Sequence, residues 1–103
     1  AELRDFLSWF NALSTGPLIR ALQKHSRELQ EAELRRWQSK LERLPAEDRD
    51  LIVGLLRGYS NKLLHDPLVQ IREFANSEEG YLHLDTVRRL FNLERFDLDE
   101  NEP

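Results

Sequence analysis

The stretch between Pro17 and Pro45 constrains the fold more than any other part of this chain of 103 residues, because it contains no residue that breaks a helix. A helix over this stretch would have about 27 residues and a length of roughly 40 Å. A compact domain of about 100 residues has a radius of gyration near 13 Å, and hence a diameter of roughly 34 Å. One helix is therefore expected to be longer than the domain is wide.

Apolar residues persist along this whole stretch, and their phase changes after Leu29. They fall first at positions 18, 22 and 29, and then at positions 34, 37, 41 and 44. Two faces of the helix therefore need cover from two different neighbours. The simplest second neighbour is another copy of the chain.

The rest of the sequence also has helical periodicity, and only eight residues are β-branched. We expect an all-α fold, a helical bundle of about five helices with one long helix, which pairs with a second copy into a dimeric bundle. The other helices are expected over residues 3–13, 47–65, 67–75 and 81–91. Thr15 and Gly16 would end the first of these helices. Asp66 would cap the helix that begins at Pro67, and a polar break is expected at 76–80.

The predicted function of this domain is association: the second and third helices of two copies are expected to pack against each other. The candidate dimer-interface residues are Leu22, Leu29, Trp37, Leu41, Ile52, Leu56, Tyr59 and Leu63. Full burial of one such side chain contributes about 1.5 to 3 kcal/mol, so several per protomer exceed an association entropy of roughly 4 to 15 kcal/mol. The pattern does not separate the residues that face the partner from those that face the chain's own core.

Two glycines, Gly54 and Gly58, lie four residues apart on the predicted helix over 47–65. Each costs about 0.8 to 1 kcal/mol relative to alanine in a helix interior. Close approach of a neighbouring helix would compensate this cost, and simple tolerance of the glycines is the alternative. Both interpretations stay open at the level of sequence.

No combination of residues in the sequence has the pattern of a catalytic or metal site. The chain has no cysteine, and His25, His65 and His83 fall on three different predicted helices. Ser60 and His65 are five residues apart, and no glycine pattern for a nucleophile or a phosphate is present. We expect no catalytic residue, no metal and no cofactor in this chain.

The net charge of −4 comes entirely from the acidic residues at the C-terminal end, which predict a solvated acidic tail over 94–103. The rest of the chain is balanced and has no basic face for nucleic acid. No apolar run is long enough for a membrane span and no secretory leader is visible, so we expect a cytoplasmic protein without membrane contact. The chain starts at Ala1 and has no methionine, which favours a fragment of a longer protein.

One motif has a residue order that helix capping and helix propensity do not explain. It consists of Asn61, Lys62, Leu63, Leu64, His65, Asp66 and Pro67. Cations in a last helical turn and a capping Asp-Pro pair explain the residue types. They do not explain the order, which resembles the C-terminal dimerisation domain of glutamyl-tRNA reductase.

The likeness extends over residues 6 to 93. The matching segments are Pro17-Leu18-Ile19 with Leu22, Glu33-Leu34 with Lys40-Leu41, Ile71-Arg72-Glu73, Tyr81-Leu82 and Leu90-Phe91-Asn92-Leu93. Gln23 and Gln30 depart from the family, which usually has arginine there, and Gly58 stands where a larger residue is expected.

The resemblance implies that residues 1–93 form a dimerisation domain, with 1–14 as the end of the spinal linker helix. The parent enzyme would reduce glutamyl-tRNA to glutamate-1-semialdehyde with NADPH, in tetrapyrrole (porphyrin, 5-aminolevulinate) biosynthesis. It would form a homodimer and hand its product to glutamate-1-semialdehyde aminotransferase. Its catalytic cysteine and cofactor site would lie in other domains, and a plant enzyme would reside in the plastid stroma.

Two other classes remain as alternatives. A monomeric helical adaptor or regulatory module would bind a partner helix in one apolar groove. A helix-turn-helix regulator would bind duplex DNA with strong salt dependence, which the balanced charge disfavours. An enzyme active within these residues is the least favoured class.

Overall fold

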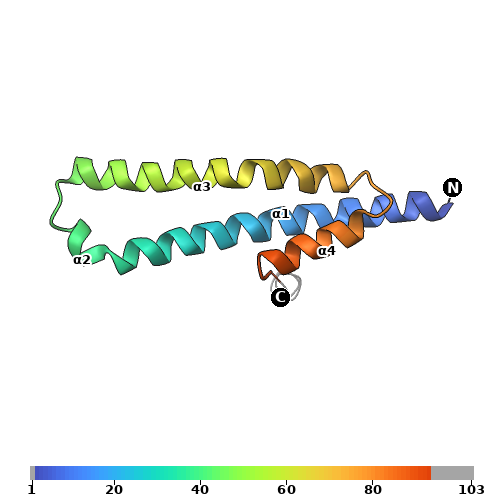
Figure 1. The fold of residues 1–103 in the computed structure, drawn as a ribbon, viewed down its shortest axis with the longest axis horizontal. Helices are drawn as coiled ribbons and strands as arrows, with labels where there is room; N and C mark the ends of the chain where they lie inside the picture. Colours follow the sequence, from blue (N-terminus) through green and yellow to red (C-terminus); the bar gives the residue numbers. More distant parts are fainter. Residues whose placement is uncertain (1, 94–103) are drawn as a thin grey trace.

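The protein is all-helical in a computed structural model, which describes the backbone of residues 2–93 and the side chains of residue 3 and residues 14–93. No strand occurs in that range, so the predicted all-α class is confirmed. The helices are α1 (Glu2–Arg36), α2 (Gln38–Leu41), α3 (Ala46–Phe74) and α4 (Gly80–Leu90) (Figure 1).

Helices α1 and α3 run antiparallel as a long hairpin, which is joined at one end through α2 (Figure 1). Helix α4 contacts both α1 and α3, and it lies along only the half of the hairpin that is remote from α2. We call this half proximal and the half next to α2 distal. The principal extents are 62 × 29 × 20 Å and the radius of gyration is 17.5 Å, against about 13 Å for a compact domain of this size. The chain is therefore elongated.

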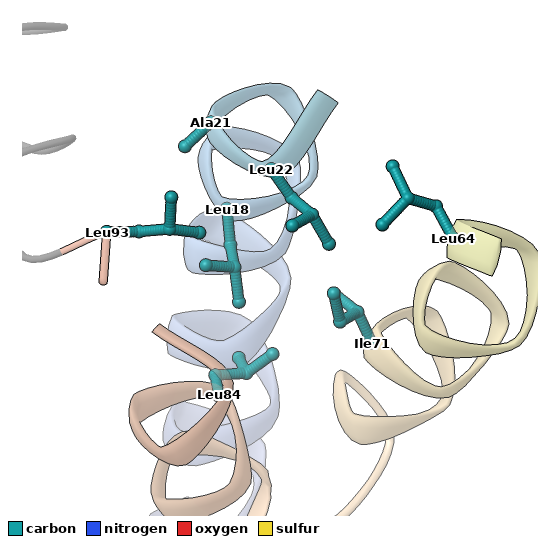
Figure 2. Packing of buried hydrophobic residues seen from close by; sticks show 7 residues of the cluster. All are labelled: Leu18, Ala21, Leu22, Leu64, Ile71, Leu84 and Leu93. Carbon is teal, nitrogen blue, oxygen red and sulfur yellow. The ribbon is translucent and has the colours of Figure 1, made fainter. Parts of the chain in front are cut away.

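Three helices and the segment after α4 meet in one hydrophobic core at the proximal end (Figure 2). This proximal core consists of Leu18, Ala21, Leu22, Leu64, Ile71, Leu84 and Leu93. Ile19, Leu68, Phe74, Val87 and Phe91 pack against it and are partly buried. The core thus fixes α4 against the hairpin, and within residues 2–93 the distal half is formed by α1, α2 and α3.

The expected helix end at Thr15 and Gly16 is wrong, because α1 continues through Pro17. A proline inside a helix removes one backbone hydrogen bond and costs about 3 kcal/mol. Here Thr15 is buried before the proline, and Leu18 and Leu22 are only 1% exposed after it. Burial of each leucine contributes about 1.5 to 3 kcal/mol, so burial on both sides outweighs the proline penalty and keeps one helix.

The expected boundary at Asp66 and Pro67 is also wrong, because α3 is continuous through both residues. Leu64 and Ile71 lie seven residues apart, two helical turns, and both enter the proximal core. A break between them would turn one of the two away from α1. Asp66 therefore caps no helix, and it lies exposed in the interior of α3.

The long helix predicted over 17–44 is interrupted at Trp37, which has φ −100° and ψ 9°. The Trp37 amide still donates to the Glu33 carbonyl at 3.2 Å, and the Trp37 carbonyl accepts from the amides of Lys40 and Leu41. The chain thus changes direction at Trp37 while the amide and the carbonyl of this residue keep backbone partners. Because α1 starts earlier than predicted, it still spans about 52 Å.

The start of α3 follows the prediction. Pro45 directly precedes the helix, and Glu47 and Asp48 lie in its first turn. Negative charge at this end is stabilised by the exposed amides of the first turn. The polar break before α4 is also found, since the chain turns between Phe74 and Gly80.

Helix α4 ends in a Schellman motif that returns the chain to the proximal core. Asn92 has a positive φ of 57°. Its amide donates to the Arg89 carbonyl at 3.2 Å, and the Leu93 amide donates to the Arg88 carbonyl at 2.7 Å. This geometry places Leu93 in the core. The predicted acidic tail over 94–103 lies outside the described residues.

None of the described helices combines the length and the apolar character needed to cross a membrane.

Candidate functional site

The distal half contains a large apolar hollow between the α1–α2 segment and α3. Its volume is about 740 Å³. We call this cavity the distal hollow. The residues that line it are Glu33, Leu34, Trp37, Lys40, Leu41, Leu44, Ile52, Leu55, Leu56 and Tyr59. Helix α4 does not extend to this region (Figure 1). An apolar concave surface of this size is the usual form of a binding site.

Trp37 lies at the break between α1 and α2 and is held there by its helical neighbours. Its Nε1–H donates to Glu33 Oε1 at 2.7 Å. The Lys40 ammonium lies 4.8 Å from the ring centroid, and the Arg36 guanidinium lies at 5.4 Å. Arg36 also pairs with Glu33 at 3.3 Å. These contacts fix the indole ring and connect the polar residues of the rim to one another.

A row of exposed apolar residues on α3 borders the distal hollow. This row, which we call the α3 ridge, consists of Leu51, Leu55, Tyr59 and Leu63. They are spaced four residues apart, and their exposed fractions lie between 62% and 73%. Leu55 and Tyr59 belong to the lining of the hollow as well. Exposed apolar surface of this extent marks an interaction site.

The distal hollow and the proximal core are separated along both helices by polar contacts. On α1, the Gln30 side-chain amide donates to Ser26 Oγ at 3.2 Å. On α3, the Ser60 hydroxyl donates to the Leu56 carbonyl at 2.9 Å. The chain therefore has two apolar regions along the hairpin. One region is covered by the chain itself, and the other is open. The two separately covered helix faces expected from the phase change after Leu29 stay a prediction, and Leu29 itself is 58% exposed.

The structure separates the candidate interface residues into three groups. Leu22 belongs to the proximal core, whereas Leu29 is 58% exposed on α1 and Leu63 lies on the α3 ridge. The other five line the distal hollow: Trp37, Leu41, Ile52, Leu56 and Tyr59. The assignment of these residues to a dimer interface stays a prediction.

Sequence reasoning left Leu34, Leu44, Leu51 and Leu55 out of the candidate interface, although all four lie in the distal hollow or on the α3 ridge. The spacing of four residues from Leu51 to Leu63 is the signal that could have identified two of them. A row at this spacing forms a ridge on a helix surface.

Gly54 and Gly58 lie beside the α3 ridge, and both are exposed. A Cβ atom added at either position would meet no atom within 4 Å. The described part of the chain therefore supplies no close neighbour, and a second copy remains the candidate for one.

Alanine at Gly54 and Gly58 distinguishes the two interpretations of these glycines. Each substitution should stabilise the isolated helix by about 0.8 to 1 kcal/mol. If a partner helix packs closely here, the added methyl groups should instead lower the melting temperature of the dimer. Thermal unfolding followed by circular dichroism measures this, and an unchanged or higher melting temperature would contradict close packing.

The histidines lie apart in the fold. His25 is on α1, His65 on α3 and His83 on α4, where it stacks on Phe74 with ring centroids 4.6 Å apart. Within the range that the structure describes, no three His, Cys, Asp or Glu side chains are grouped to hold a metal.

The sequence motif at 61–67 is part of the scaffold. Leu64 enters the proximal core, Pro67 is half-buried, and Asn61, Lys62 and His65 are exposed. Since α3 does not end here, the last-turn role expected for Lys62 and His65 is wrong.

The fold and the site together define a class: an all-α domain whose core closes one end of a helical hairpin and whose other end presents an uncovered apolar surface. A family model described as glutamyl-tRNAGlu reductase, dimerisation domain, matches residues 1–93. The chain belongs to this family, as the resemblance predicted.

Several full-length relatives agree with the family match. Over 93 residues the chain is 36% identical to the glutamyl-tRNA reductase of Heliobacterium mobile, covering 90% of this chain and 21% of the relative. The same figures apply to the enzyme of Roseiflexus sp. strain RS-1. Identity is 30% to that of Natranaerobius thermophilus, covering 90% and 20%. The chain thus spans about a fifth of the length of these relatives. No solved structure matches it.

Proposed function

We propose that this chain joins two copies of a glutamyl-tRNA reductase, and that the distal hollow and the α3 ridge are the surfaces through which the copies pair. The observation that carries the proposal is the distal hollow, an apolar surface that no other element of the described chain covers. The family to which the chain belongs is described as a dimerisation domain, which supports the same conclusion.

Burial of apolar side chains is the driving force expected for this association. The four ridge residues and the exposed Trp37 are large apolar side chains, and full burial contributes about 1.5 to 3 kcal/mol for each. Since these residues are already partly covered in the protomer, the gain per residue is smaller. Two copies contribute equally, so the total gain is at least of the same size as the association entropy cost of roughly 4 to 15 kcal/mol.

The relatives are named glutamyl-tRNA reductase, and the reaction of the whole protein is proposed from the family resemblance. It would be the NADPH-dependent reduction of glutamyl-tRNA to glutamate-1-semialdehyde in tetrapyrrole biosynthesis, with the aminotransferase that uses this aldehyde as a partner. The residues of this chain do not fit the cofactor: its four glycines all lie within helices, so they form no loop that could bind a dinucleotide phosphate. We assign to this chain the joining of protomers and no step of the reaction.

Sedimentation of the full chain at micromolar concentration tests the proposal. We expect a species of twice the protomer mass of 12.2 kDa, with a helical circular dichroism spectrum. A dimer is expected because a single protomer would leave the apolar side chains of both the distal hollow and the α3 ridge exposed to water. A monomer with an intact helical spectrum would exclude the proposal and would favour the adaptor class.

A further inference from the structure

We propose that the α3 ridge of each copy enters the distal hollow of the other copy, so that the dimer contains two equal ridge-in-hollow contacts. This inference rests on the proposed function and specifies what fills the hollow. Its occupant is a helix of a second copy of this chain, namely α3 between Leu51 and Leu63.

The shape of the two surfaces supports this pairing. Residues four apart on a helix form a ridge, and ridges of one helix pack into the grooves between helices or side-chain rows of another. The α3 ridge extends over about 18 Å at 1.5 Å per residue. The hollow is an open groove between the α1–α2 segment and α3, so it can accept a helix from the side.

The chemistry of the hollow favours an uncharged apolar occupant. Its only charged lining residues are Glu33 and Lys40, which are of opposite sign and both contact Trp37. An anionic or a cationic ligand would meet no excess of opposite charge there, and burying its charge would be costly. The leucines of the ridge bring no charge into the hollow.

Symmetry selects a second copy over an unrelated helix. In a two-fold dimer the same surface is used on both subunits, and each contact occurs twice. The ridge and the hollow are contiguous, since Leu55 and Tyr59 belong to both. A second copy would cover both surfaces on both partners. A foreign helix in the hollow would cover Leu55 and Tyr59 but would leave Leu51 and Leu63 of the ridge exposed.

A complementation experiment with the full chain tests the inference. Leu51→Asp alters only the ridge, because Leu51 is 73% exposed and does not line the hollow. Leu41→Lys alters only the hollow. Each variant alone should lose dimerisation, with at least a hundredfold rise in Kd. In a one-to-one mixture the two variants can form a heterodimer. One of its contacts joins the unchanged ridge of the Leu41→Lys chain to the unchanged hollow of the Leu51→Asp chain, and the other contact pairs Asp with Lys. This heterodimer should form with a Kd within about tenfold of the wild-type value.

Native mass spectrometry and sedimentation measure the result, since the two variants differ in mass. Leu90→Asp on α4 is the matched control, because Leu90 is 76% exposed and lies outside the hollow and the ridge; it should remain a dimer. Circular dichroism verifies folding, and Leu44→Lys replaces Leu41→Lys if the latter unfolds.

The outcomes separate this inference from the proposed function. If the wild-type chain is a dimer but the mixture stays monomeric, the ridge does not meet the hollow and the inference is overturned while pairing stands. Single variants that still form dimers overturn it as well. A monomeric wild-type chain refutes the proposed function itself.

Discussion

Replacement of Ile71 by alanine is expected to lower the free energy of unfolding by about 2 to 5 kcal/mol. The side chain is 0% exposed, and Figure 2 shows it directed from α3 toward the α1 residues of the proximal core. Truncation would leave a cavity where α1, α3 and α4 meet. Two of these helices are long and continuous, so they cannot easily move to fill it. Urea unfolding followed by circular dichroism measures the change.

Leu63→Ala is the matched control on the same helix. Leu63 is 62% exposed on the α3 ridge, so its truncation should cost the protomer less than about 1 kcal/mol. Pairing contributes to stability in proportion to the logarithm of protein concentration. The effect of Leu63→Ala should therefore depend on concentration, whereas that of Ile71→Ala should not. Equal losses from both substitutions at low concentration would contradict the division between core and ridge.

The sequence was sufficient where local chemistry decides the structure. Helical periodicity predicted the all-α class, and the helix expected from residue 47 agrees with α3, which begins at Ala46. In each case the signal lies within a few residues of the feature that it specifies, and no distant contact opposes it.

The two proline boundaries failed because distant contacts override local preference. Pro17 and Pro67 are each followed by residues that must reach the proximal core, and this requires a continuous helix. At Trp37 the reverse holds: the helix breaks although neither glycine nor proline is present to predict a break. A single sequence shows the cost of a proline but not the burial that offsets it.

Identical residue types also limit what a sequence can say about the site. Leu22 and Leu63 are both leucines on helical stripes, yet one is 1% exposed and the other 62%. The difference arises from the helix face that each leucine occupies, since Leu64, directly after Leu63 on α3, is 9% exposed and belongs to the proximal core. The way the helices face one another in the fold therefore decides which leucines are available to a partner.

Truncation of Trp37 to alanine is expected to weaken pairing by at least about 2 kcal/mol, or roughly 30-fold in Kd. Trp37 lines the distal hollow, and its ring is already fixed by Glu33 and Lys40. Because the ring is held in place before association, little side-chain entropy is lost when a partner covers it. Tryptophan in a fixed position at the centre of an apolar surface is typical of residues that dominate interface energetics. Sedimentation equilibrium over a concentration series measures the change in Kd.

Trp37→Phe separates the apolar surface of this residue from its hydrogen bond. Phenylalanine keeps an aromatic ring in the hollow but cannot donate to the Glu33 carboxylate, which accepts from Trp37 Nε1 at 2.7 Å. If burial of the ring drives pairing, this variant should retain most of the wild-type affinity, and alanine should not. Equal losses for both variants would instead make the Glu33 contact the decisive feature. If neither variant changed Kd, with helical content intact, the distal hollow would lie outside the interface, because a partner seated there has to contact this ring.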